Sequence, residues 1–529
     1  MKKVIIMLLV ISMAVGLFAV GCSSNPEQNA GKEDQKETAQ EPDATSGQED
    51  EKDKEVVLVI AQTRDVTSLD YALASQTETL NMSSNIFDTL VRLDENYNYV
   101  PWLAESWENP DPNTWVFHLR EGIKFTNGEA VNAGAVKYSM ERIMDPEVKS
   151  PQAWRLTLVD KVETPDANTV VIKTKQPYAA LINIMTLMFV VPPKAVEEMG
   201  NEQFAQNPIG SGPFVFEKFV PGEEVVLVAN KDYWKGAPKV DKLVFRPISE
   251  ASTRVAALET GEVDIIGSVP PNRLDALNKN QDIKTSAKTG IMLYMGLDTF
   301  NPPLDKVKVR QAVNYAMDVQ AITDSILLGT ARPMAGPVFR ATKGFDEDIK
   351  PYPHDIDKAK QLLKEAGYEN GFELTLSTPP QGVEGTTNTM EVAQAIAAQL
   401  GEVGIKVTLD ITDPATQFER YKNKEFQAYL FTWDTQVEPD RYLYSLFNSE
   451  ARGYYYKNEQ VDALLGEGRS TMDQEAREII YNELHQLLYE DAPWGFLYNQ
   501  EAYYGVRANV DYEAPVDGIM FMYNAEKNG

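Results

Sequence analysis

The sequence contains a single cysteine, Cys22, so an intrachain disulfide, a CxxC redox pair and a thiolate zinc cluster are all excluded. Histidine is almost as scarce, because His118, His354 and His485 are the only three and lie far apart. The pattern around His118 indicates a strand and that around His485 a helix, which favours structural or surface roles for both. The sequence therefore suggests no histidine or cysteine metal site.

Motifs that carry enzyme chemistry are also missing. We find no GxxxxGK[ST] phosphate-binding loop, no GxSxG nucleophile elbow and no HExxH zinc motif. Residues 94–105 resemble a calcium-binding loop, with Asp94 first and Glu105 last, but Tyr99 stands where such a loop needs glycine. A turn between two strands is the better interpretation. We therefore predict no catalytic residue, no metal, no cofactor and no enzymatic activity.

An excess of positive charge is absent as well. The 529 residues include 50 Lys and Arg against 79 Asp and Glu, which gives a net charge of −29. Nucleic acids are bound by basic surfaces that neutralise phosphates, so this balance argues against a nucleic-acid partner and against a polybasic membrane patch. With 43% hydrophobic and 24% charged residues, the composition is that of a globular protein. The length predicts about three folding units.

One long apolar run is present, and it lies at the N-terminus. Lys2 and Lys3 precede 17 uncharged residues, 4–20, and residues 19–22 (AVGC) end the run. This pattern indicates an export signal, and AVGC is similar to the bacterial lipobox, with Ala19 in place of the usual leucine. We therefore expect a lipoprotein signal peptide over residues 1–21 and acylation of Cys22, for example by palmitate. An uncleaved signal anchor is the alternative.

Residues 22–55 are expected to be a lipidated cysteine followed by a disordered tether. Between residues 27 and 54 the chain has ten acidic residues and four lysines, and almost no apolar side chain larger than alanine. Such a segment buries too little apolar surface to fold. Two or three acyl chains on Cys22 would anchor the protein stably to a membrane. We predict that the anchor is its only membrane contact.

The rest of the chain alternates between strand and helix patterns. Residues 56–60 form an apolar run typical of a buried strand, and residues 114–119 alternate with a period of two. Residues 131–144 place apolar side chains on one helical face. A second helix is expected after Asp355, its N-cap, and would end at Gly367. Helices interleaved with short strands predict an α/β fold.

Several longer segments carry a family resemblance. Residues 207–214 (NPIGSGPF), 231–234 (KDYW) and 261–264 (GEVD) together resemble the signature of family 5 solute-binding proteins, the oligopeptide- and dipeptide-binding group of ABC importers. The resemblance extends in the same order over residues 56–525. It includes the segments 85–90 (NIFDTL), 101–107 (PWLAESW), 115–125 (WVFHLREGIKF), 309–316 (VRQAVNYA) and 357–368 (DKAKQLLKEAGY).

This resemblance implies two α/β lobes of the type II periplasmic-binding-protein-like fold, with a ligand cleft between the lobes. We expect chain crossovers near residues 293–297 and 493–499. Lobe one would then be residues 56–295 plus 497–529, with an extra subdomain at about 97–207, and lobe two residues 296–496. The implied partners are the permease subunits of an ABC importer, whose ATPase is a separate chain. The protein is expected to be a monomer on the outer face of a Gram-positive-like cell membrane.

The resemblance also implies ligand-binding residues. In peptide-binding relatives the segment after a Leu-Asp pair adds to the ligand backbone as a strand, which here nominates Ser75, Gln76 and Thr77. A second loop of the family contains a tryptophan, an aspartate that binds the peptide's ammonium group, and an Asp-Pro-Asp. In this chain the loop spans residues 431–441 (FTWDTQVEPDR), in which Trp433 and the Pro-Asp pair at 439–440 match the family. The candidate ligand-binding residues of this loop are Trp433, Asp434, Thr435, Gln436 and Arg441.

The second loop departs from the family pattern. It is one residue shorter, and Gln436 stands where the ammonium-binding aspartate is expected, although Asp434 could replace it. Dipeptide-binding relatives hold the ligand carboxylate with an arginine near the position of Met390 and Glu391, where this chain has no basic residue. We therefore expect weak binding of free dipeptides. An oligopeptide is the first hypothesis for the ligand, and an oligosaccharide or nickel chelate is the alternative.

Overall fold

The computed structural model describes residues 55–529 except 381–387, 435–436, 451–454, 516 and 529. The predicted signal peptide, Cys22 and the tether therefore lie outside the described residues, as do Thr435 and Gln436. Residues Glu55–Gly529 form one compact unit. No helix of the described part has both the length and the apolar character that a membrane-spanning segment needs.

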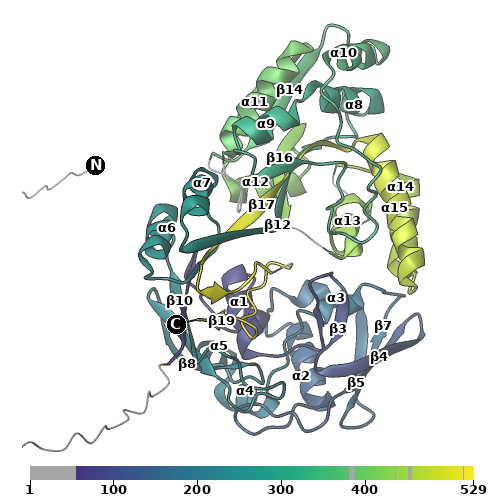
Figure 1. The fold of residues 1–529 in the computed structure, drawn as a ribbon. Coiled ribbons are helices and arrows are strands. Elements are labelled where there is room, and N and C mark those ends of the chain that lie inside the picture. The colour runs from purple at the N-terminus through teal and green to yellow at the C-terminus, as the bar shows by residue number, and fades with distance from the viewer. Residues whose placement is uncertain (1–54, 381–387, 435–436, 451–454, 516, 529) are drawn as a thin grey trace, which may run out of the picture. The chain divides into compact units, whose positions relative to one another are not determined.

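One large mixed sheet runs through this unit (Figure 1). Its strands follow the spatial order β15 (Ile405–Ile411), β14 (Phe372–Thr378), β16 (Ala428–Asp434), β12 (Ile283–Leu297), β17 (Trp494–Arg507), β11 (Ile265–Ile266), β1 (Val57–Gln62), β10 (Lys242–Pro247), β9 (Glu224–Ala229) and β8 (Phe214–Val220). The short strand β13 (Ala331–Pro333) pairs with β17 off this path. The predicted α/β class is confirmed.

Strands β12 and β17 connect the two ends of the sheet. They pair antiparallel from Ile283 opposite Arg507 to Gly296 opposite Trp494. Both segments that we expected to cross between the lobes, 293–297 and 493–499, overlap these strands. The structure thus has two lobes joined through a pair of long strands, while the exact boundary residues stay predictions.

Lobe two has a core on each face of its strands. Along β12, Leu293 and Met295 enter one core and Met292 and Tyr294 enter the other, as the period of two requires. The first core packs against α8 (Val307–Ala316), α9 (Val319–Ser325), α10 (Ile356–Glu365) and α11 (Thr389–Glu402). The second packs against α12 (Pro414–Lys422), α13 (Pro439–Phe447), α14 (Glu459–Ser470) and α15 (Gln474–Asp491).

Lobe one contains a second, smaller sheet with its own core. Its strand order is β4 (Ala104–Asp111), β5 (Thr114–Leu119), β7 (Thr169–Thr174) and β6 (Val159–Glu163), and α2 (Ala133–Met144) packs against it. This is the extra subdomain implied by the family resemblance. The remaining elements of lobe one are the strands β2 (Val91–Leu93), β3 (Tyr99–Pro101), β18 (Val510–Asp511) and β19 (Glu526–Lys527), the 3-10 helices η1 (Tyr71–Leu73) and η2 (Ala153–Leu156), and the helices α1 (Thr77–Ile86), α3 (Leu181–Ile184), α4 (Pro193–Met199), α5 (Asn201–Gln206), α6 (Ala251–Thr260) and α7 (Pro271–Lys279).

The local signals in the sequence have the predicted effects. The Asp355 carboxylate accepts the Lys358 N–H at 2.8 Å and caps α10, and Gly367 follows that helix with a φ of +84°. The calcium-like segment is a turn between β2 and β3, in which the Asp94 carboxylate accepts the backbone N–H groups of Asn96 and Asn98. The described residues contain no group of three or more His, Cys, Asp or Glu that could hold a metal.

A buried carboxylate in lobe one joins several of the segments that carry the family resemblance. Asp88, which is 0% exposed, accepts hydrogen bonds from two tryptophans, a serine and a tyrosine. The donors are Trp102 Nε1 at 2.7 Å, Ser211 Oγ at 2.9 Å, Tyr233 Oη at 2.9 Å and Trp234 Nε1 at 3.2 Å. Burial raises the pKa of Asp88, and the Arg92 charge and three of these donors oppose the rise. Four of the segments that carry the family resemblance, 85–90, 101–107, 207–214 and 231–234, thus meet at one side chain.

Two glycines allow Ser211 to reach this carboxylate. The Gly212 N–H donates to the Ile86 carbonyl at 2.9 Å, so residues 210–212 lie against the end of α1. A Cβ atom at Gly210 would lie 1.9 Å from that carbonyl oxygen, and one at Gly212 would lie 2.6 Å from its carbon. The glycines of the NPIGSGPF segment therefore serve close backbone packing rather than ligand contact.

Lobe two also encloses a titratable group. His485 on α15 is 0% exposed; its Nδ1 accepts the Asp346 N–H at 3.1 Å, and its Nε2 contacts the Ala335 carbonyl. Burial lowers its pKa to about 4. His118 is half-exposed on β5. The predicted strand and helix positions of these two histidines are confirmed, and His485 is a structural residue.

We predict that Asp88→Asn destabilises the protein by about 3 kcal/mol, because an amide cannot accept all four hydrogen bonds and leaves buried donors unsatisfied. Urea unfolding of the purified protein measures this. The matched control is Asp232→Asn, a change at an exposed carboxylate of the neighbouring KDYW segment, which should leave the unfolding free energy within about 0.5 kcal/mol of the wild type. Equal stability of the two variants would contradict the structural role of Asp88.

We predict that His485 makes the protein less stable in mild acid. Its folded pKa of about 4 lies below the usual 6.5, so between these values the unfolded chain binds a proton that the folded chain does not. As the pH falls from 6.5 to 4, this linkage should remove about 3 kcal/mol of stability. Unfolding at pH 7 and pH 4.5 should show a smaller loss in His485→Gln than in wild type. The exposed His354→Gln should behave like wild type, and identical pH dependence of all three proteins would refute the linkage.

Candidate functional site

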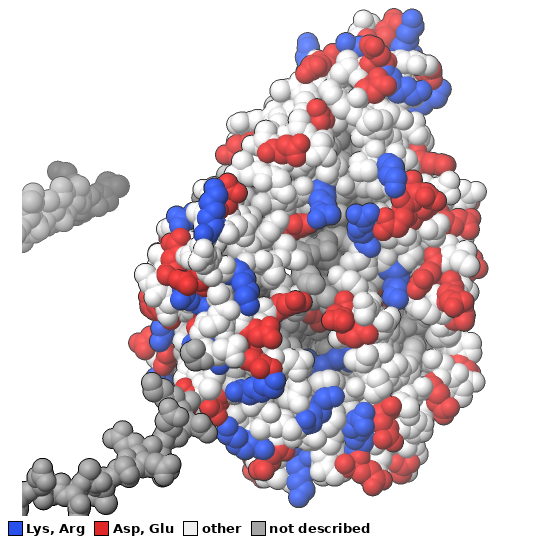
Figure 2. All heavy atoms as spheres, in the orientation of Figure 1, with Lys and Arg blue, Asp and Glu red and all other residues white. Residues whose placement is uncertain are grey.

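The two lobes face each other across a hollow. In the orientation of Figure 1, Figure 2 shows the surface hollowed near α13, with acidic and basic side chains around the hollow. The lobes also touch directly, because the Tyr99 hydroxyl donates to Glu438 Oε2 at 3.4 Å and the Ala179 N–H donates to the Arg469 carbonyl at 2.9 Å. Tyr99 and Ala179 belong to lobe one, and Glu438 and Arg469 belong to lobe two.

Two ion pairs fix the start of α13 at this interface. Arg477 pairs with Glu438, and both side chains are 3% exposed. Arg469 binds Asp440 through two nitrogens at 2.9 and 3.0 Å. Glu438 also caps α13 by accepting the Asp440 N–H at 3.1 Å. These contacts hold the first turn of the helix, which carries Arg441.

Arg441 faces groups from both lobes. Burial and the nearby Arg155 charge lower the pKa of Arg441 to about 9, while Tyr71, Asp434 and Tyr178 act in the opposite direction. Asp434 belongs to lobe two; Tyr71, Arg155 and Tyr178 belong to lobe one. Within the described part of the chain, the Arg441 guanidinium forms no hydrogen bond or ion pair.

Arg155 is held by neutral partners only. It is 8% exposed, and its Nε donates to Gln152 Oε1 at 2.7 Å while one terminal nitrogen donates to the Tyr71 hydroxyl at 3.3 Å. The Trp154 ring covers it, with the ring centre 4.6 Å from the guanidinium carbon. Gln152 in turn donates to the Ala74 carbonyl at 2.6 Å. This network links Arg155 to the segment that leads into Ser75.

The first group of predicted residues lies between η1 and α1. Ser75 and Thr77 are exposed and Gln76 is half-exposed. The Gln76 side chain accepts a hydrogen bond from the Thr67 hydroxyl at 3.4 Å. Among the described residues, the backbone of Ser75 has no hydrogen-bond partner within the protein. A peptide could therefore pair with this backbone as an added strand, as the family resemblance implies.

The second group lies at the end of β16. Trp433 is half-buried opposite Met292 and packs against a core of lobe two, and Asp434 is exposed opposite Ile291. The surrounding protein raises the pKa of Asp434 although the residue is exposed, and the Arg441 charge opposes this rise. Thr435 and Gln436 lie outside the described residues.

Sequence reasoning missed three further residues of lobe one. Tyr71, Arg155 and Tyr178 act on Arg441, yet no motif in the sequence pointed to any of them. Met390 and Glu391 lie in the first turn of α11, where Glu391 is the acidic residue.

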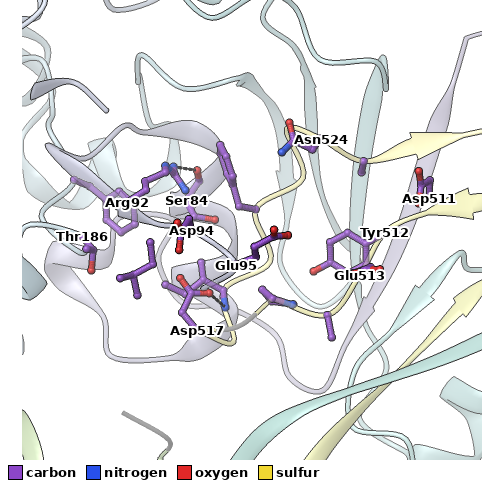
Figure 3. A pocket seen from close by; sticks show the side chains of 17 residues that line it. Ser84, Arg92, Asp94, Glu95, Thr186, Asp511, Tyr512, Glu513, Asp517 and Asn524 are labelled. Atoms are coloured by element: carbon purple, nitrogen blue, oxygen red, sulfur yellow. Dashed lines mark hydrogen bonds between the residues drawn. The ribbon is translucent and has the colours of Figure 1, made fainter. Parts of the chain in front are cut away.

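Lobe one also contains a separate pocket of about 340 Å³ (Figure 3). It lies between the β2–β3 turn and the C-terminal segment. Its lining residues include five acidic side chains: Asp94, Glu95, Asp511, Glu513 and Asp517. They also include Arg92, which donates a hydrogen bond to the Ser84 carbonyl at 3.0 Å. None of the predicted site residues that the structure describes lines this pocket.

The fold and the hollow between the lobes define the class. Two α/β lobes joined by paired strands, with charged groups of both lobes facing each other, are the arrangement of a solute-binding protein that closes around its ligand. The chain belongs to the bacterial extracellular solute-binding proteins, family 5, whose middle region matches residues 98–455. Members of this family are binding proteins that work with ABC importers and are not enzymes.

Named relatives agree with this assignment. The glutathione-binding protein GsiB of Escherichia coli O1:K1 is 32% identical over 458 residues, which cover 83% of this chain and 88% of GsiB. HbpA2 from Haemophilus parasuis has a TM-score of 0.83 and 27% identity, covering 89% of this chain and 100% of HbpA2. DppA from Helicobacter pylori, solved with the peptide STSA, has a TM-score of 0.73 and 28% identity, covering 89% of this chain and 98% of DppA. The predicted family and the type II two-lobed fold are confirmed.

Proposed function

We propose that this protein captures a short peptide between its lobes and delivers it to the permease of an ABC importer. The contact between the lobes at the start of α13 is the observation that carries the proposal, because Tyr99 and Ala179 of lobe one meet Glu438 and Arg469 of lobe two next to the predicted site residue Arg441. A peptide presents an ammonium group, a carboxylate and a hydrogen-bonding backbone. The predicted site residues of this chain offer a carboxylate at Asp434, a guanidinium group at Arg441 and, among the described residues, a backbone segment at Ser75 that has no hydrogen-bond partner.

The relatives support a peptide as ligand. GsiB is named a glutathione-binding protein, and DppA was solved with the tetrapeptide STSA. Glutathione and STSA are both longer than a dipeptide, which fits the expectation that free dipeptides bind weakly here. Asp434 is proposed to take the role of the ammonium-binding aspartate that Gln436 cannot perform. An oligosaccharide or a nickel chelate remains the alternative ligand.

We further propose that the mature protein is a lipoprotein and acts as a monomer. The AVGC sequence at residues 19–22 and the acidic segment after it support acylation of Cys22 and a flexible connection to the membrane. The membrane contact would then be the anchor alone. The binding unit would remain on the outer face of a Gram-positive-like cell membrane, near its permease.

Replacing Cys22 by Ser should move the protein from the membrane fraction to the soluble medium of expressing cells, because the acylated side chain is lost. Fractionation followed by immunoblotting measures this, and mass spectrometry of the wild-type N-terminus should detect the acyl chains. A matched control is Ser23→Ala, which leaves the cysteine intact and should remain in the membrane fraction. Quantitative membrane retention of the Cys22→Ser protein would mean that the signal is an uncleaved anchor.

Titration calorimetry with glutathione, STSA, a set of dipeptides and several oligosaccharides tests the ligand class. We expect micromolar or tighter binding of at least one of the longer peptides, and weaker binding of every dipeptide. Trp433→Ala should weaken peptide binding by about 2 kcal/mol if Trp433 is a central contact. Phe300→Ala, which removes a 44% exposed aromatic side chain of lobe two, is the control. Binding of an oligosaccharide but no peptide would overturn the proposed ligand class.

A further inference from the structure

The separate pocket of lobe one, of about 340 Å³, has no role in the proposed function (Figure 3). Its volume lies at the lower end of the range of small-molecule sites, about 300–1,000 Å³. Apolar side chains, among them Leu93, Phe189 and Phe521, form part of its wall. Another part is formed by the five acidic side chains named above, which come from the β2–β3 turn and the C-terminal segment. The pocket therefore combines an apolar surface with an excess of negative charge.

The five carboxylates of this pocket are unpaired. Within the described part of the chain, none of them lies at ion-pair distance from a lysine, an arginine or a histidine. Other acidic side chains of lobe one do have such partners, since Glu224 pairs with Lys218 at 2.9 Å and Asp241 pairs with Lys231 at 2.5 Å. The pocket thus presents carboxylates that the chain itself does not neutralise.

Arg92 is the one basic side chain among the described residues that line the pocket, and it is engaged by the wall. Its guanidinium carbon lies 3.5 Å from the centre of the Phe521 ring and 4.9 Å from that of Trp102, and one terminal nitrogen donates to the Ser84 carbonyl at 3.0 Å. Its Nε atom and the Tyr512 hydroxyl are buried and have no hydrogen-bond partner in the described part of the protein. Because a buried polar group without a partner is destabilising, the pocket retains hydrogen-bonding capacity that the protein does not use.

The spacing of the carboxylates suits an organic cation better than a metal ion. Nowhere in the described residues do three or more His, Cys, Asp or Glu side chains form a group that could hold a metal. An alkylammonium or guanidinium group is larger, is attracted by several carboxylates at once, and binds favourably over aromatic faces such as that of Tyr512. Its alkyl stem would cover the apolar part of the wall.

We propose that this pocket of lobe one binds a small organic cation, an ammonium or guanidinium group on an alkyl stem. Lysine and arginine side chains of a peptide and free alkylamines share this chemistry. The site is separate from the residues proposed to hold the peptide, and its first test needs no peptide. It therefore stands or falls independently of the proposed function.

The first test compares Nα-acetyl-lysine amide with Nα-acetyl-norleucine amide, which lacks only the ammonium group and is likewise without charged termini. Calorimetry on the wild-type protein at low salt should show binding of the lysine compound that is tighter by about tenfold or more. Raising the salt from about 0.01 M to about 1 M, which shortens the screening length from about 30 Å to about 3 Å, should weaken that binding. Equal affinity of the two compounds would overturn the site.

A pair of double variants locates the binding. Glu95→Gln with Glu513→Gln removes one exposed carboxylate from each side of the pocket and should weaken binding of the lysine compound by about fivefold or more. The matched control is Glu198→Gln with Asp232→Asn, which removes two exposed carboxylates of lobe one that do not line the pocket and should change the affinity by less than about twofold. An equal loss in both double variants would show that the net charge of the surface attracts the cation, and would overturn the site.

Two further probes distinguish the sources of the cation. n-Pentylamine carries the ammonium group without a peptide, and the tripeptide Ala-Lys-Ala carries it as a side chain that its norleucine counterpart lacks. Binding of pentylamine that the Glu95→Gln, Glu513→Gln protein loses would identify a free amine as a ligand. A preference for Ala-Lys-Ala over its counterpart that the same variant loses would identify a side chain of the captured peptide. Equal binding of both tripeptides, with no binding of either amine compound, would overturn the site and leave the proposed function intact.

Discussion

The Asp88 carboxylate is the contact on which the architecture of lobe one depends. It receives donors from three segments that are distant in sequence, at Trp102, Ser211 and Tyr233–Trp234, and it follows directly after α1. Its own carbonyl accepts the Val190 N–H at 3.0 Å, which brings in the segment after α3. The extra subdomain is thereby fixed to the main sheet.

The charged residues around the start of α13 differ in how they are paired. Glu438, Asp440, Arg469 and Arg477 form two ion pairs that hold the first turn of the helix. Within the described part of the chain, Asp434 and Arg441 form no ion pair. We therefore propose that the paired residues serve stability and that Asp434 and Arg441 are the ones available to a charged ligand.

The sequence predicted local structure well because the signals are local. The apolar run at 56–60, the alternation at 114–119 and the Asp355 cap correspond to β1, β5 and α10. The family resemblance predicted the two lobes. The contacts between the lobes at the start of α13 could not be predicted, because they depend on how distant segments meet and no sequence motif marks Tyr99, Glu438 or Arg469. Ser75 to Thr77 came from the resemblance and remain predictions, as do Trp433 and Asp434.

Closure of the lobes around a peptide is the central claim, and a distance measurement between the lobes tests it most directly. Cys22 is the only native cysteine, so a Cys22→Ser background with Asp160→Cys and Lys360→Cys carries one spin label on each lobe at an exposed position. Pulsed electron paramagnetic resonance then gives the distance distribution with and without STSA or glutathione. The account predicts a shorter and narrower distribution with bound peptide. An unchanged distribution under conditions where calorimetry shows saturation would contradict it.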